Sequence, residues 1–207
     1  TKRKLGSGFR AAWASALIYL FLNSLFTFYG VSPNTETFFG TFVAAAFWLA
    51  LAFPGHIGYF ASGLLLGFGF LIKPVVCFDS LALGVFLLWD TPQSIRKISA
   101  LAFLALGFLL PFAGAYAHYR AMGHADTFLF YAFEASSRYP VSAGWEEYLI
   151  SAVDTLLRFL PVTYFFYVAL RHPQTPASTR RLAWIWGLSV LIPIYLPGKF
   201  FGHYFIQ

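Results

Sequence analysis

Seven hydrophobic stretches divide the chain, and they constrain its fold more than any other feature. The stretches cover residues 11–29, 37–53, 57–76, 77–90, 98–117, 148–170 and 182–197. Only 11% of the residues are charged, whereas soluble domains carry about 25%. So few polar groups cannot cover a surface in water, but about 20 apolar residues form a helix that crosses a bilayer. The sequence therefore predicts an all-α, polytopic transmembrane helix bundle with about seven spans.

The basic residues indicate how such a bundle is oriented. Nine of the fourteen Lys and Arg residues lie in the segments 1–10, 91–97 and 171–181. Seven spans place these segments on one side of the membrane, and the positive-inside rule makes that side cytoplasmic. We therefore expect a multi-pass integral membrane protein with these three segments on the cytoplasmic side. The bacterial inner membrane is its expected location, and the endoplasmic reticulum is the alternative.

The acidic residues gather on the opposite, outer side, where seven of the eight are expected and only Asp90 is not. The positive-inside rule does not require this, because acidic residues contribute little to it. Basic residues and histidines join them there, among them His118 and Arg120, which directly follow the fifth stretch. This mixture is typical of a polar cavity that handles a ligand. Ordinary solvated loop charge is the alternative interpretation.

The segment VSPNTETFFG, residues 31–40, predicts the start of a helix on the outer side. Asn34 or Thr35 can cap that helix, and Glu36 in its first turn is favoured by the helix dipole. Glu36 is therefore either part of a simple cap or a group in the outer cavity, where it acts as an acid, a base or a hydroxyl binder.

Lys73 lies at membrane depth in GFLIKPVVC, residues 69–77. A lysine there is costly and usually faces a partner or a wet cavity. Pro74 breaks the helix next to it. Lys73 either extends to the interface or pairs with an anionic ligand such as a lipid phosphate. In the third hydrophobic stretch, 57–76, Gly63 and Gly67 form a small-xxx-small pattern that predicts close contact with another helix.

The outer loop at 118–147 is too aromatic for a plain solvated loop. We expect an amphipathic interfacial helix around 126–138, with Glu134 and Arg138 at helical spacing. Asp154 and Arg158 share this spacing, and a structural pair within one helix is the better interpretation there. The histidines are scattered and Cys77 is the only cysteine, so the spacing does not support a metal site.

The two ends of the sequence predict that the chain is an internal piece of a longer protein. It opens on TKRKLGSGFR without an initiator Met and closes on PGKFFGHYFIQ, where a new hydrophobic run begins. Lys199 and His203 in this last segment are expected on the same side as Lys73.

Four segments together resemble a known family. They are KRKLGSGFR, NTETFF, GLLLGFGFLIKP and GKFFGHYFIQ, in this order along the chain. The pattern resembles the polyprenyl-phosphate-sugar-dependent glycosyltransferases of the C-type membrane fold, in particular the protein O-mannosyltransferase and lipid A aminoarabinose transferase superfamily. The resemblance extends over nearly the whole chain and implies that residues 1–207 are part of one transmembrane glycosyltransferase domain.

The resemblance also implies an activity and a set of site residues. A sugar would move from a polyprenyl-phosphate donor to a lipid, glycan or protein acceptor on the periplasmic or luminal side. Membrane lipids are the other expected partners, with no nucleic acid and no certain cofactor. The main catalytic carboxylate would precede Thr1, so the fragment alone is expected to be inactive, and Glu36 would support that carboxylate. The residues implied to bind the donor phosphate are Lys73, Arg138, Lys199, His203 and Tyr204. The rest of the outer cavity is expected to be lined by Asn34, His118, Arg120 and Glu134.

Lys199 departs from the family pattern, because bacterial relatives often carry arginine there, and a lysine cannot make the same bidentate phosphate contact.

Two other functions fit the same composition. A polytopic transporter or lipid flippase would use the intramembrane charges Lys73 and Asp79, but should place such charges near the membrane midplane. A purely structural membrane subunit would bind no ligand at all.

Overall fold

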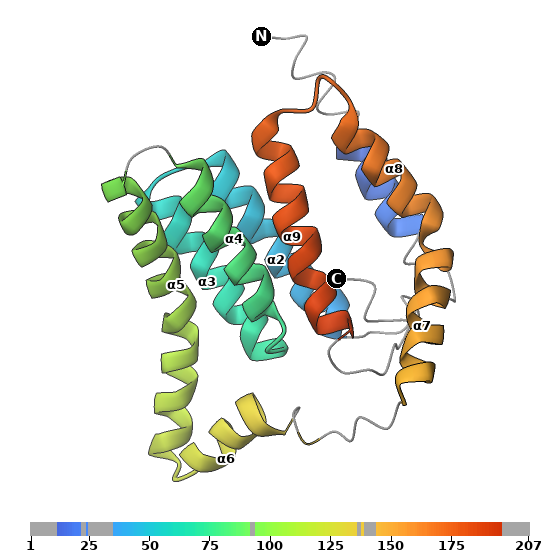
Figure 1. Cartoon of the computed structure of the whole chain (residues 1–207). Coiled ribbons are helices and arrows are strands. Elements are labelled where there is room, and N and C mark those ends of the chain that lie inside the picture. Colours follow the sequence, from blue (N-terminus) through green and yellow to red (C-terminus); the bar gives the residue numbers. More distant parts are fainter. Residues whose placement is uncertain are drawn as a thin grey trace.

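The computed structural model describes residues 12–21, 24, 35–91, 94–135, 138 and 144–195, and these residues form helices and short connections without any strand. A helix at Ala12–Phe21 comes first. Then follow α2 (Thr35–Ala52), α3 (His56–Ile72), α4 (Val76–Asp90), α5 (Ser94–Ala121), α6 (Ala125–Leu129), the π-helix η2 (Phe130–Glu134), α7 (Trp145–Arg158), α8 (Leu160–Arg171) and α9 (Ala177–Tyr195) (Figure 1). The predicted all-α class is confirmed for this part of the chain.

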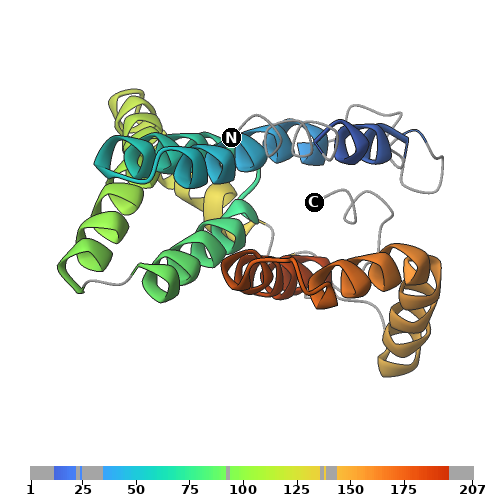
Figure 2. The same cartoon turned by 90° about the horizontal axis from the view of Figure 1, so that it is seen from above.

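The helices stand in two rows when the molecule is seen from above (Figure 2). The helix at Ala12–Phe21, α2 and α3 form one row, α4, α9 and α8 form the other, and α5 closes one side. The closest packing is of α3 against α5 and α2, and of α4 against α9. A buried hydrogen bond of 2.7 Å from Ser62 Oγ to the Ala46 carbonyl also joins α3 to α2. The core is therefore built mainly on α2, α3, α4 and α5.

Glycines allow α3 and α5 to approach each other closely. A Cβ atom on Gly63 would collide with the backbone carbonyl of Leu104, and one on Gly107 would collide with that of Phe60. Gly67 likewise lies against the backbone of Phe108. Since only a residue without a side chain fits at such a contact, the close contact predicted from Gly63 and Gly67 is confirmed, and its partner is α5.

The Lys73–Pro74 dipeptide sets the boundary between α3 and α4. Proline disfavours helical geometry in the residue before it, and Lys73 is accordingly extended, with φ −150° and ψ 121°. Its N–H still bonds the Gly69 carbonyl at 3.0 Å, and its own carbonyl accepts the N–H of Val76 at 3.2 Å. The third predicted stretch, 57–76, is thus too long, since the helix ends at Ile72.

Two of the described helices, α2 and α5, are long and apolar enough to cross a membrane, and a third candidate is the bent pair α7–α8. This is fewer than the seven predicted spans. The reason is helix length: α3 has 17 residues and α4 has 15, so they rise about 26 and about 22 Å against a hydrocarbon core of about 30 Å. The helix α9 is not among these candidates either, and it carries the charged residues Arg180 and Arg181 in its early turns.

The sixth predicted stretch, 148–170, is not straight. Between α7 and α8 the chain bends by 63°, next to Pro161 in the first turn of α8. On α7, Arg158 Nη2 and Asp154 Oδ2 lie 2.6 Å apart, and both side chains are largely exposed. This agrees with their interpretation as a structural pair within one helix.

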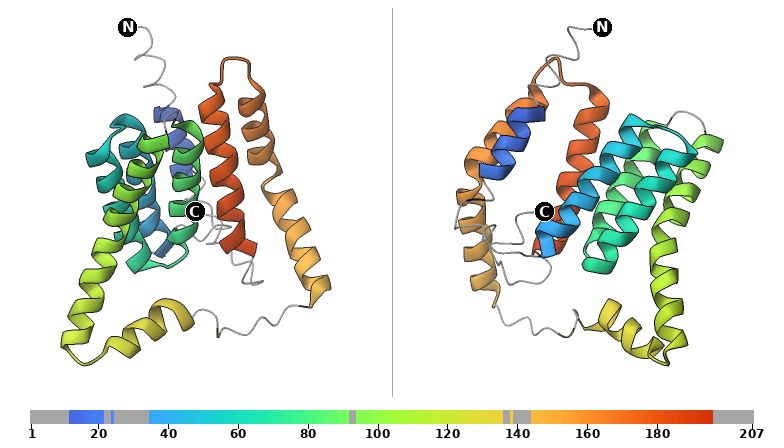
Figure 3. Two further views of the ribbon diagram at one scale, coloured as in Figure 1. Left: turned by 60° about the vertical axis from the view of Figure 1, so that its left-hand side comes forward. Right: turned by 180° about the vertical axis from the view of Figure 1, so that it is seen from behind.

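The bundle has two ends, which carry different chemistry. At the Lys73 end, α2 begins, α3 ends and α4 begins; at the Asp90 end, α2 and α4 end while α3, α5 and α9 begin. The segment predicted as an interfacial helix is helical over α6 and η2, somewhat shorter than 126–138. Beyond the Lys73 end, α5 continues and α6 turns back beneath the bundle (Figure 3).

Candidate functional site at the Lys73 end

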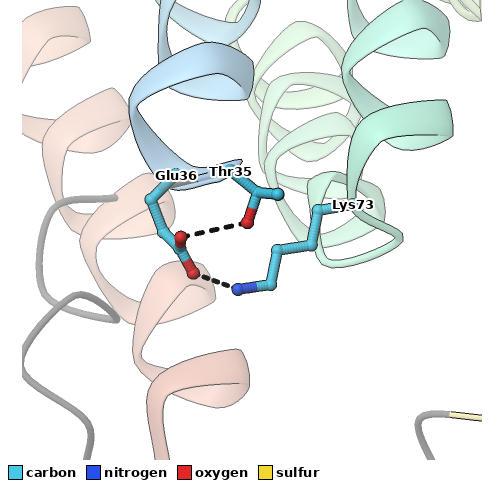
Figure 4. Close-up of polar contacts among 3 residues, drawn as sticks. All are labelled: Thr35, Glu36 and Lys73. Atoms are coloured by element: carbon cyan, nitrogen blue, oxygen red, sulfur yellow. Dashed lines mark hydrogen bonds and ion pairs between the residues drawn. The ribbon is translucent and has the colours of Figure 1, made fainter. Parts of the chain in front are cut away.

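Glu36 and Lys73, which are 37 positions apart in the sequence, meet at the Lys73 end (Figure 4). Lys73 Nζ donates a hydrogen bond to Glu36 Oε1 and forms an ion pair with it. Thr35 Oγ1 donates to the other carboxylate oxygen, Oε2, at 3.1 Å. The Glu36 side chain is 1% exposed and that of Lys73 is 23% exposed. The carboxylate is therefore enclosed, while the ammonium reaches the surface of the bundle.

Local structure explains why these side chains converge. Glu36 lies in the first turn of α2, where the partial positive charge of the helix start favours an acid. Lys73 follows α3 directly in the extended conformation that Pro74 imposes. Because α2 and α3 are antiparallel neighbours, the start of one helix lies beside the end of the other.

Electrostatics explains why they pair. A charge removed from water is costly unless it is paired and hydrogen-bonded, and Glu36 obtains both from Lys73 and Thr35. Glu36 is thus more than a simple cap, and Lys73 turns toward another helix instead of simply extending to the interface. An ammonium carries three N–H donors, so the Lys73 side chain can in principle bond to more than one acceptor at once.

A second polar contact at the same end joins α4 to α9. Trp186 Nε1 donates to the buried Asp79 Oδ1 at 2.7 Å. The Trp186 ring stacks on Phe47 of α2 with a centroid distance of 4.3 Å, and Ser189 Oγ donates to the Phe78 carbonyl at 2.6 Å. Asp79 was expected at this end from the sequence, whereas Trp186 was not. The indole in a hydrophobic stretch was a signal, because a buried Trp N–H usually has an acceptor.

The other predicted site residues do not join the Glu36–Lys73 pair in the described structure. Glu134 Oε2 and Arg138 Nη2 form their own ion pair at 3.1 Å, and both side chains are exposed. The Arg138 guanidinium lies over the Phe130 ring at 4.7 Å. His118 and Arg120 are exposed in the last turn of α5. Four predicted residues lie outside the described residues: Asn34, Lys199, His203 and Tyr204.

The segment that carries Glu134 nevertheless lies near the Lys73 end. The ring of Phe133 in η2 is 6.2 Å from that of Phe70, which lies in the last turn of α3, and 5.6 Å from that of Phe112 in α5. Aromatic contacts thus hold η2 beside the turn that precedes Lys73.

Within the described residues, no group of three or more His, Cys, Asp and Glu side chains could hold a metal ion. Cys77 is half-buried and its thiol is free. No described hydrogen bond joins Cys77 to Glu36 or to Lys73.

No protein-family model, no curated protein and no solved structure shows a significant match to this chain. What the chain can do must therefore be argued from its own residues.

Proposed function

We propose that the protein is an integral membrane glycosyltransferase that moves a sugar from a polyprenyl-phosphate donor to an acceptor at the outer membrane surface. The observation that carries this proposal is the enclosed Glu36 carboxylate, paired with Lys73 where α2 begins and α3 ends. In this arrangement a fixed cation lies at the boundary of an apolar bundle, as capture of a lipid phosphate requires.

Lys73 is the group that acts on the leaving phosphate. As the bond between sugar and phosphate breaks, negative charge grows on the phosphate oxygens, and a cation already in place stabilises that charge where water is scarce. Glu36 fixes the position of the ammonium through its hydrogen bond and ion pair. Because both Glu36 oxygens already accept hydrogen bonds, its role is to position Lys73, and the base that activates the acceptor is a different carboxylate.

The outer location belongs to the proposal as well. Two of the basic segments lie at the Asp90 end of the bundle. They contain Arg96 near the start of α5, Arg171 at the end of α8 and Arg181 near the start of α9. Glu36, Lys73 and Asp79 lie at the other end. With the Asp90 end cytoplasmic by the positive-inside rule, the bundle crosses the bilayer seven times and the Lys73 end faces outward. The short helices α3 and α4 then require local thinning of the bilayer.

The position of the charges favours this function over a transporter or flippase. Glu36 and Asp79 lie in the first turns of their helices, and Lys73 directly follows a helix. A transport site of the broken-helix type lies near the midplane, whereas these three residues lie at one end of the bundle.

The test is donor cleavage in membranes that contain the full-length protein, since the chain alone is expected to be inactive. The probes are radiolabelled polyprenyl-phosphate mannose and polyprenyl-phosphate aminoarabinose, and the measured product is free polyprenyl phosphate. We expect Lys73→Met to lower the rate about a hundredfold, the effect of removing one preorganised charge-stabilising donor. Arg158→Gln, which breaks only an exposed pair on α7, serves as the matched control and should leave the rate unchanged.

Two results would overturn the proposal. One is no cleavage of either donor by the native protein. The other is a native rate in the Lys73→Met variant. Movement of intact donor between leaflets without cleavage would support the flippase alternative instead.

A further inference from the structure

The Asp90 end contains a cavity of about 720 Å³, at the opposite end of the bundle from Glu36 and Lys73. Its walls come from the end of α2, the start of α3, the end of α4 and the starts of α5 and α9. Small-molecule sites in proteins occupy about 300–1,000 Å³. The cavity is thus large enough for a ligand of the size of a lipid headgroup.

The cavity has an apolar floor and a polar rim. Tyr59, Phe86 and Leu182 belong to the floor, and Phe86 is almost fully buried. The rim carries hydrogen-bonding side chains from three helices and one connection: His56, Thr91, Arg96, Ser178 and Thr179. An amphiphilic ligand with a compact polar group fits this distribution better than a purely apolar one.

The charge balance of the rim is positive. Asp90 is the only carboxylate among the lining residues, and Arg181 of α9 already neutralises it in an ion pair. Arg96 lines the cavity without an ion pair to any described residue. An anion that enters the cavity therefore meets one uncompensated guanidinium.

The polar groups match phosphate in particular. A guanidinium can donate two parallel hydrogen bonds to two phosphate oxygens. Ser178 and Thr179 offer hydroxyl donors from the first turn of α9, where the helix dipole also favours negative charge. The His56 ring is held by stacking on Phe103 with centroids 4.5 Å apart, so its position at the rim is fixed.

We propose that this cavity binds a phosphate ester, with Arg96 as the main ligand and Ser178 and Thr179 as supporting donors. The phosphate comes from the headgroup of an anionic membrane lipid or from a soluble phosphate ester, and the same rim chemistry serves both. The site is independent of the Glu36–Lys73 pair.

The test compares two adjacent basic residues of α5. Arg96 lines the cavity, whereas Lys97 does not. Arg96→Gln and Lys97→Gln remove the same charge from the same turn. Binding is measured as thermal stabilisation of the purified chain in phosphatidylcholine nanodiscs, upon addition of phosphatidylglycerol to the bilayer in one arm and of glycerol 3-phosphate to the buffer in the other.

We expect saturable stabilisation that Arg96→Gln weakens about tenfold in apparent affinity, the effect of one lost charge-assisted hydrogen bond, and that Lys97→Gln preserves. Stabilisation by phosphatidylglycerol alone identifies a lipid headgroup, and stabilisation by glycerol 3-phosphate identifies a soluble ester. Equal weakening in both variants would show only nonspecific attraction to charge and would overturn the proposal, as would no stabilisation by either probe.

Discussion

The two ends of the bundle each hold an ion pair between different helices, but the environments of these pairs differ. At the Lys73 end, Glu36 is 1% exposed. At the Asp90 end, Arg181 and Asp90 are 39% and 31% exposed and lie beside an open cavity. One pair therefore encloses its acid completely, whereas water reaches both members of the other.

The two exposures indicate which pair needs a functional explanation. A half-exposed pair costs little to form and contributes little to stability. An enclosed carboxylate pays a large desolvation cost, and apolar residues of similar volume would often stabilise the protein as well or better. The Asp90–Arg181 pair is adequately explained as a link between α4 and α9, whereas the Glu36–Lys73 pair indicates a role beyond stability.

The largest expected loss of stability comes from removing only one member of the enclosed pair. Lys73→Met leaves the Glu36 carboxylate buried without its cation, and we expect the free energy of unfolding to fall by about 3–5 kcal/mol. Equilibrium unfolding in mixed micelles measures this loss. The double variant Glu36→Leu/Lys73→Met should recover most of it, because no buried charge remains. A single variant as stable as the native protein would show that Glu36 is not enclosed.

The next largest loss of stability is expected from disturbing the close packing of α3 against α5. Gly107→Ala places a methyl group against the Phe60 carbonyl of α3, and we expect a loss of about 1–3 kcal/mol from overpacking. Gly114→Ala in the same helix meets no atom within 4 Å. It should stabilise the protein by up to about 1 kcal/mol through helix propensity. Equal shifts in melting temperature for both variants would contradict the close α3–α5 contact.

A smaller effect is expected at the Asp90 end. Asp90→Asn removes the acid of the half-exposed pair, and we expect a loss of about 1 kcal/mol or less. The same unfolding measurement applies, and added salt should reduce the difference further because the pair is partly solvated. A loss as large as that of Lys73→Met would erase the distinction between the two ends.

The smallest effect concerns the exposed pair on α7. Arg158→Gln removes an i, i+4 contact to Asp154, a type of pair that contributes about 0.3–0.5 kcal/mol. The melting temperature should hardly change. A substantial decrease would indicate that Arg158 contacts another part of the protein.

Sequence reasoning predicted those features that depend on local chemistry. The hydrophobic stretches marked most of the helices, Gly63 and Gly67 marked a close contact, and the spacing of Asp154 and Arg158 gave a pair within one helix. Each of these three features follows from helical periodicity or from the size of a side chain. Periodicity and side-chain size can be read from the sequence without knowledge of the neighbouring helices.

Features that depend on neighbouring helices were not predictable. The partner of Lys73 could not be named, because nothing in the sequence determines that α2 and α3 place Glu36 beside it. The bond from Trp186 to Asp79 and the cavity at Arg96 depend in the same way on how α9 packs. Fewer described helices than predicted stretches are long and apolar enough to cross a membrane, because α3 and α4 are shorter than a hydrophobic run in the sequence indicates.

The proposed orientation requires that the Lys73 end and the Asp90 end of the bundle lie at opposite membrane surfaces. In a Cys77→Ala background, Thr35→Cys places a thiol at the exposed start of α2 beside Glu36, and Ser94→Cys places one at the exposed start of α5. A membrane-impermeant maleimide added to intact cells should label position 35 and should label position 94 only after permeabilisation. Labelling of position 94 in intact cells, or of both positions from the same side, would contradict an outward-facing Glu36–Lys73 pair.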